Sequence, residues 1–146
     1  RSPVRRTMDE SGAVAAPDRG GGSMEAGMDL RFKERDGVLF ARVAANELGA
    51  DTAEEFRRNL LAGIDGHAWV VLDLTPVTFM DSSGLGVLVA AMKALRGRGE
   101  LRLTGVDARI QELFSLTGLN RVFQVEPDER AAVAGLQAAR RRKEAA

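Results

Sequence analysis

Residues 77–88 read Val77-Thr78-Phe79-Met80-Asp81-Ser82-Ser83-Gly84-Leu85-Gly86-Val87-Leu88, and this stretch decides the fold. An apolar segment from Trp69 to Leu74 precedes it, and the segment that follows has almost no polar residues in its first two turns. Aspartate, serine and glycine favour the first positions of a helix. The stretch therefore predicts the passage from a buried strand to a helix. In α/β proteins, such passages are also where functional groups are placed.

The composition excludes several classes of function. A chain of 146 residues that is 45% hydrophobic fits one domain with a real core. It has 21 basic and 21 acidic residues, so no overall charge attracts nucleic acid or an anionic membrane. It has no cysteine and one histidine, which excludes disulfides, thiolate chemistry and a multi-histidine metal site within one chain. We predict no cofactor, no metal, no direct nucleic-acid partner and no membrane partner.

Residues 1–28 are predicted to form a disordered N-terminal segment. They contain prolines and a Gly20–Gly22 run but no leucine, isoleucine or aromatic residue, so ordering them is not offset by apolar contacts. Because the chain begins with Arg1 rather than methionine, an upstream remnant is one interpretation of part of this segment. It also lacks the apolar core of a secretory signal, and we predict a cytoplasmic protein. The folded domain is predicted over residues 29–146.

From Asp29 onward the pattern predicts elements in the order β-β-α-β-α-β-α-β-α. Asp36-Gly37 is the turn of an opening hairpin, and Asp51-Thr52-Ala53-Glu54 fits a helix cap with an acid three residues on. The remaining strands are expected at residues 69–74, 101–103 and 122–125, and the remaining helices after Ser82, Val106 and Pro127. Strands that alternate with helices imply an α/β single domain. Its mixed central sheet has about five strands, mostly parallel, packed with about four helices.

The central helix is predicted to have two different faces. At about 100° per residue, an apolar side faces the sheet and consists of Leu85, Leu88, Ala91, Met92 and Leu95. The opposite side is made mostly of small residues, namely Ser82, Ser83, Gly86, Ala90 and Lys93. Small side chains allow another backbone to approach closely, which favours a docking surface with two hydroxyls at its tip. The alternative is that Ser82 or Ser83 is only an N-cap and that a loop of the protein covers this face.

The segment Asp81-Ser82-Ser83-Gly84-Leu85-Gly86-Val87 resembles the signature of the STAS domain, specifically that of the bacterial anti-sigma-factor antagonists. The resemblance extends from about Asp29 to about Leu136 and includes the stretch Leu113–Leu119. It implies a STAS-like fold in which Ser82 is the phosphorylation site, with Ser83 as the second choice. With the predicted face, it implies a partner-binding surface made of Asp81, Ser82, Ser83, Gly84, Gly86, Ala90, Lys93 and Asp51.

The resemblance also implies a function. The dephosphorylated protein would bind an anti-sigma factor that is also a serine kinase, which frees the sigma factor. The kinase would phosphorylate Ser82 with ATP and Mg²⁺, and a PP2C-like phosphatase would reset it. This chain would then be a switched binding module and no enzyme, a monomer or weak dimer that needs no cofactor of its own. The alternatives are a sensory or scaffold STAS module, in a signalling assembly or beside a transporter, and a weak nucleotide-binding protein.

Two further patterns bear on this interpretation. A serine hydrolase would need Gly-x-Ser-x-Gly and a nearby histidine, but His67 precedes the strand that leads to Ser82 and is expected at its far end. A phosphate-binding loop would need a lysine that this stretch lacks. The family often has an acid in the loop after the second strand, where this chain has Gly49. Either Asp51 or Glu47 substitutes for it, or that contact is absent.

Overall fold

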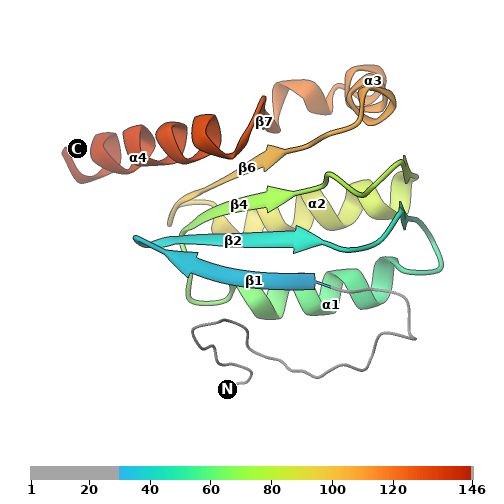
Figure 1. Ribbon diagram of the computed structural model, residues 1–146, viewed down its shortest axis with the longest axis horizontal. Coiled ribbons are helices and arrows are strands. Elements are labelled where there is room, and N and C mark those ends of the chain that lie inside the picture. Colours follow the sequence, from blue (N-terminus) through green and yellow to red (C-terminus); the bar gives the residue numbers. More distant parts are fainter. Residues whose placement is uncertain (1–29, 146) are drawn as a thin grey trace.

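The computed structural model describes residues 30–145, and Figure 1 shows their arrangement. The strands are β1 (Leu30–Arg35), β2 (Val38–Val43), β3 (Glu47–Leu48), β4 (Trp69–Asp73), β5 (Phe79–Met80), β6 (Glu100–Thr104) and β7 (Gln124–Glu126). The helices are α1 (Ala53–Ile64), α2 (Ser82–Leu95), α3 (Ala108–Thr117), the short 3-10 helix η2 (Leu119–Arg121) and α4 (Glu129–Ala145). The predicted disorder of residues 1–28 lies outside the described residues.

The central sheet has the order β1-β2-β4-β6-β7. Only β1 and β2 are antiparallel, and every other neighbouring pair is parallel. This confirms the predicted α/β fold, with its mixed five-strand sheet and four α-helices. The strands β3 and β5, which form a separate parallel pair, were not predicted from the sequence. Each has only two residues, too few for a periodic pattern to reveal.

The sheet is covered on both faces, and β4 runs through its middle. Val70 and Leu72 belong to the larger apolar cluster, which also includes the buried sides of α1, α2 and α3. Val71 points the other way, into a smaller cluster with Leu136 of α4. Figure 1 shows α4 on one side of the sheet and α1 and α2 on the other. This two-sided burial explains why the strand from Trp69 has few polar residues.

Two predicted details are wrong. The last strand begins at Gln124 rather than at residue 122, because η2 precedes it and turns Phe123 into the core, 5.1 Å from the ring of Phe114 between centroids. The predicted cap, Asp51 with Glu54 three residues on, is absent: Thr52 is the N-cap of α1, and its side chain makes no capping bond. Its hydroxyl instead accepts from the N–H of Gly49 at 3.3 Å. The Thr52 hydroxyl is therefore used within the turn from Gly49 to Thr52, and no capping box forms at the start of α1.

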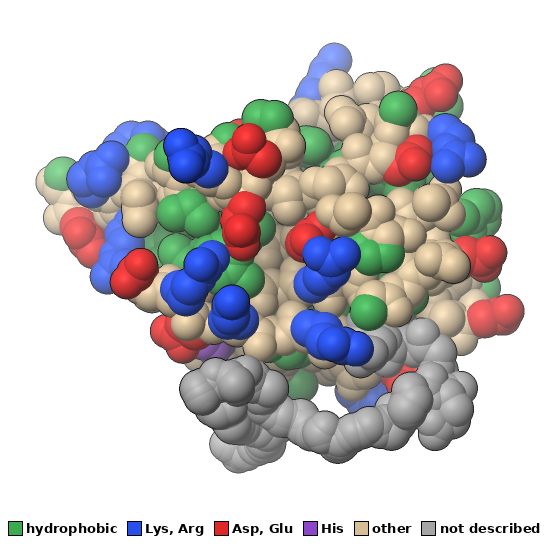
Figure 2. Space-filling model, in the orientation of Figure 1, with side chains coloured by type: hydrophobic (Ala, Val, Ile, Leu, Met, Phe, Trp, Pro, Cys, Tyr) green, Lys and Arg blue, Asp and Glu red, His purple; other side chains and the backbone are tan. Residues whose placement is uncertain are grey.

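The sheet face under α4 is only partly filled. A hollow of about 400 Å³ lies between the start of α4 and the β1–β2 hairpin, and Figure 2 shows hydrophobic side chains gathered there among charged ones. At its edge, the Arg35 guanidinium lies 4.4 Å from the centre of the Phe40 ring and pairs with Glu129 at 3.5 Å. An arginine, an aromatic ring and a carboxylate thus form one compact group. This hollow is at the end of the sheet opposite the start of α2.

Candidate functional site

Asp81 organises the start of α2. It is the N-cap residue, and its Oδ1 atom accepts hydrogen bonds from the N–H of Ser83 at 2.8 Å and of Gly84 at 3.3 Å. Its Oδ2 atom accepts from the N–H of Ala50, at 3.1 Å, in the loop between β3 and α1. One carboxylate therefore caps the helix and also holds the β3–α1 loop against the helix tip.

Neither Ser82 nor Ser83 is the N-cap of α2, a role that the sequence left open for both. Ser82 is the first residue of α2 and is exposed, while Ser83 is half-buried. Because Asp81 supplies the cap, the alternative in which a serine hydroxyl caps the helix is wrong. Within residues 30–145 neither hydroxyl forms a hydrogen bond. The Ser82 side chain is therefore accessible to another molecule at the end of a rigid helix.

The outer face of α2 has the predicted composition. Gly86 and Lys93 are exposed and Ala90 is half-buried, so no described segment of the chain covers this face. The residues predicted to face the sheet are buried, apart from a half-buried Met92; they are Leu85, Leu88, Ala91 and Leu95. A flat strip of small side chains thus leads away from Ser82 along the helix.

The two glycines of the motif have different surroundings. Gly84 is buried, and a β-carbon there would collide with the carbonyl oxygen of Leu48 and lie 2.9 Å from Met80 Cγ. A β-carbon on Gly86 would have nothing within 4 Å. Gly84 therefore allows α2 to pack closely on β3, and it is not part of the surface on which the sequence analysis placed it. Gly86 is exposed at the centre of that surface.

The β3–α1 loop lies beside the start of α2. It contains Gly49, the position at which STAS anti-sigma factor antagonists often have an acidic residue. A β-carbon at Gly49 would lie 2.9 Å from Oδ2 of Asp81. An acidic side chain at this position would therefore start against the Asp81 carboxylate and repel it. The residues considered as substitutes, Glu47 and Asp51, are both exposed on either side of Gly49. β3 and the loop after it thus present two carboxylates to solvent near the start of α2.

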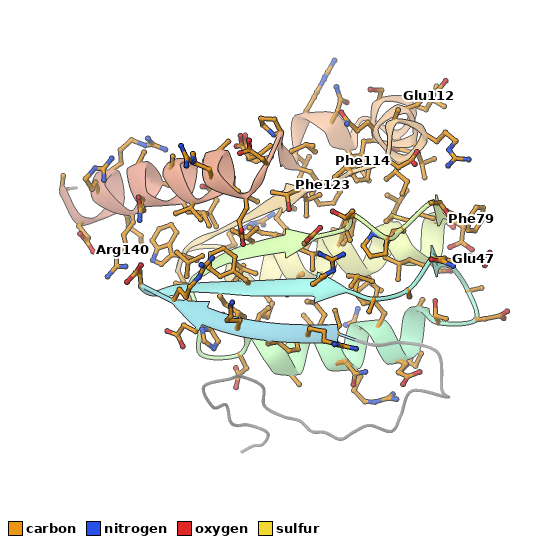
Figure 3. All side chains as sticks on the ribbon, in the orientation of Figure 1. Glu47, Phe79, Glu112, Phe114, Phe123 and Arg140 are labelled. Atoms are coloured by element: carbon orange, nitrogen blue, oxygen red, sulfur yellow. The ribbon has the colours of Figure 1, made fainter. Side chains whose placement is uncertain are left out.

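Phe79 was not singled out as a functional residue from the sequence. Its side chain is 51% exposed, whereas that of Met80 is 5% exposed. Side chains of neighbouring strand residues point in opposite directions, so only one of this apolar pair can enter the core. Alternation indicates that one of the two residues is exposed, but only the pairing of β5 with β3 decides that it is Phe79. Figure 3 shows Phe79 and Glu47 close together at the same end of the molecule.

Among residues 30–145 no group of three or more His, Asp or Glu side chains could hold a metal ion. His67 precedes β4, and Ser82 lies at the opposite end of that strand, as the order of the elements predicts. No helix in the described part of the chain is long and apolar enough to cross a bilayer.

Comparisons with known proteins agree with this geometry. The family model described as the STAS domain matches residues 29–132. An anti-sigma-B factor antagonist of Listeria monocytogenes is 37% identical over 101 residues, which cover 68% of this chain and 89% of that protein.

Two solved structures share the fold. The crystal structure of an anti-sigma factor antagonist from Mycobacterium paratuberculosis has a TM-score of 0.69 at 24% identity and covers 79% of this chain and 98% of its own. The murine solute carrier 26 family member A9, an anion transporter, has a TM-score of 0.63 at 25% identity over 73% of this chain, but only 18% of the transporter is matched. With the family model covering the whole sheet and the Asp81 motif, the chain belongs to the STAS domain family.

Proposed function

We propose that this protein is an anti-sigma factor antagonist that binds its anti-sigma factor through the outer face of α2. The observation that carries the proposal is the exposed Ser82 at the tip of a helix whose outer face is formed by Gly86 and Ala90. The relative from Listeria monocytogenes, whose match with this chain covers 89% of its own length, is named for the same role. The protein itself catalyses nothing in this scheme.

The second part of the proposal is a phosphate switch at Ser82. The anti-sigma factor acts as a serine kinase and transfers the γ-phosphoryl group of ATP to Ser82 Oγ, which loses its proton while ADP leaves. A PP2C-like phosphatase hydrolyses the ester and restores the hydroxyl. Both reactions need metal ions, and these belong to the partner enzymes.

The hydrogen bonds of Asp81 support a surface position for this phosphate. The N–H groups of Ser83 and Gly84, which could otherwise receive an anion at the helix terminus, already donate to Asp81. A phosphate on Ser82 therefore remains at the surface, beside the Asp81 carboxylate, with a charge of about −1.5 to −2. Burying an unpaired charge against a partner costs several kcal/mol, and every ~1.4 kcal/mol lowers the affinity tenfold. Phosphorylation then prevents docking without unfolding the domain.

The test uses three purified baits and a lysate of the native cells. Ser82→Ala keeps the surface small and cannot be phosphorylated, while Ser82→Asp adds a negative charge. Ser115→Asp is the matched control, because Ser115 is exposed on α3 and receives the same charge there. We expect Ser82→Ala and Ser115→Asp, but not Ser82→Asp, to capture a protein that mass spectrometry identifies as an anti-sigma factor with an ATPase fold.

The captured factor is then purified and mixed with the wild-type protein, ATP and Mg²⁺. Phosphate on Ser82, located by peptide mass spectrometry, is the expected product. Equal capture by Ser82→Asp and Ser82→Ala would refute the switch. Absence of any anti-sigma factor from all three captures would favour the scaffold alternative, in which the domain is part of a larger assembly.

A further inference from the structure

Phe79 is exposed in a place where solubility alone would favour a polar residue. Its ring is 51% exposed, and it lies two residues before the capping Asp81. Met80 is required in the core, and the pairing of β5 with β3 fixes the strand direction, so the Phe79 side chain must point outward. The ring lies beside Gly49, because its Cε2 atom is 3.6 Å from where a β-carbon of that residue would stand. Phe79 is thus an exposed apolar side chain at the edge of the proposed docking surface.

Carboxylates surround this ring. Glu47 is the direct partner of Phe79 in the β3–β5 register and is exposed. Oδ2 of Asp81 also lies near Gly49, 2.9 Å from where its β-carbon would stand, and Asp51 is exposed in the loop that contains Gly49. No basic residue lies between Ala44 and Phe56 or between Leu74 and Ala91, the two segments that contain β3 and β5. The face of an aromatic ring and a neighbouring carboxylate both attract a cation.

Elsewhere in this protein, an arginine already binds an aromatic ring and a carboxylate together. At the opposite end of the sheet, the Arg35 guanidinium lies over Phe40, 4.4 Å from the ring centre, and pairs with Glu129 at 3.5 Å. Phe79 and Glu47 repeat the ring and the carboxylate of that group, but no described residue supplies the arginine. A planar guanidinium can stack on a ring and pair with a carboxylate together, which suits arginine better than lysine.

We propose that Phe79 and Glu47 form a subsite for an arginine side chain of the docking partner. This rests on the proposed function, since the partner is the anti-sigma factor that binds beside Ser82. The subsite complements the α2 face: the small residues allow close approach, and the aromatic side chain supplies the large contact area typical of residues that dominate binding energy. It also makes the complex depend on charge, because the partner has to present a cation to an acidic edge.

The test measures the affinity of variants for the purified anti-sigma factor that the Ser82→Ala bait captures. Phe79→Leu keeps an apolar side chain but removes the aromatic face, and we expect it to weaken binding at least fivefold. Glu47→Gln removes the carboxylate and should weaken binding severalfold at low salt, with a smaller effect of added salt than in the wild type. Leu116→Ala is the control, because Leu116 is 78% exposed on α3 and should leave the affinity unchanged. Melting temperatures establish that each variant is folded.

The outcomes separate this inference from the proposed function. Wild-type affinity of Phe79→Leu, together with failure of Ser82→Asp to bind, would refute the arginine subsite and leave the switch intact. Wild-type affinity of both Phe79→Leu and Ser82→Asp would refute the subsite and the switch together. An equal loss for Leu116→Ala would mean that apolar exposure in general governs binding, which also refutes the subsite. If the variants behave as expected, replacing single arginines of the partner by alanine should identify one whose loss abolishes the effect of Phe79→Leu.

Discussion

The two glycines of the motif provide the sharpest test of how α2 is used, because the same substitution should have opposite effects at two neighbouring sites. At Gly86 a β-carbon meets nothing within 4 Å, so Gly86→Ala adds only helix propensity. Alanine is favoured over glycine inside a helix by about 0.5–1 kcal/mol. For a domain of this size we expect the melting temperature to rise by about 2–6 °C.

At Gly84 the added carbon collides with the carbonyl oxygen of Leu48, which belongs to the backbone of β3 and cannot rotate away. Overpacking of this kind costs about 1–3 kcal/mol, which exceeds the gain in helix propensity. Gly84→Ala should therefore lower the melting temperature by about 5–10 °C. Thermal denaturation followed by circular dichroism measures both changes. Destabilisation by Gly86→Ala, or a rise in melting temperature with Gly84→Ala, would refute the packing described for α2.

The binding assay completes this test. If the partner backbone approaches the outer face closely, the new methyl group on Gly86 stands between the two molecules. The Gly86→Ala variant should then be more stable than the wild type and yet bind the anti-sigma factor at least several times more weakly. Unchanged affinity would show that the partner does not approach the helix at this point, whatever the role of Ser82.

Three other predictions concern neighbouring groups. Asp81→Ala removes a helix cap and the partner of the Ala50 N–H, and it should lower the free energy of unfolding in urea by about 1–3 kcal/mol. Ala90→Arg adds bulk and charge to the outer face, so it should abolish partner binding in a calorimetric titration while the melting curve changes little; a normal affinity would count against docking there. The side chain and the backbone N–H of Arg109 both donate to Asp107 and lower the pKa of that carboxyl below its ordinary value. Its contribution to stability is therefore present above about pH 4 and lost as the pH falls through the lowered pKa, so Asp107→Asn should lose less stability than the wild type on acidification.

The sequence alone determined the features that depend on local chemistry. The apolar run at Trp69, the helical spacing of Leu85 and Leu88, and the turn at Asp36-Gly37 each depend on residues close together in the chain. They predicted the element order, the mostly parallel sheet and the side of α2 that faces it. They also placed Ser82 at the start of that helix, because aspartate followed by serine favours a helix N-terminus.

Only the tertiary structure decided which residues lie together around the start of α2, at Ser82. The β3–β5 pair joins segments 32 positions apart, Glu47 with Phe79, and its two-residue strands have no pattern of their own. That pairing buries Gly84 against Leu48, leaves Gly86 open and turns Phe79 outward beside Glu47. Neither which of the two glycines is buried nor which of the two apolar residues is exposed follows from composition or spacing. Both depend on the backbone of β3 lying beside β5 and α2, and the packing of the whole domain sets that arrangement.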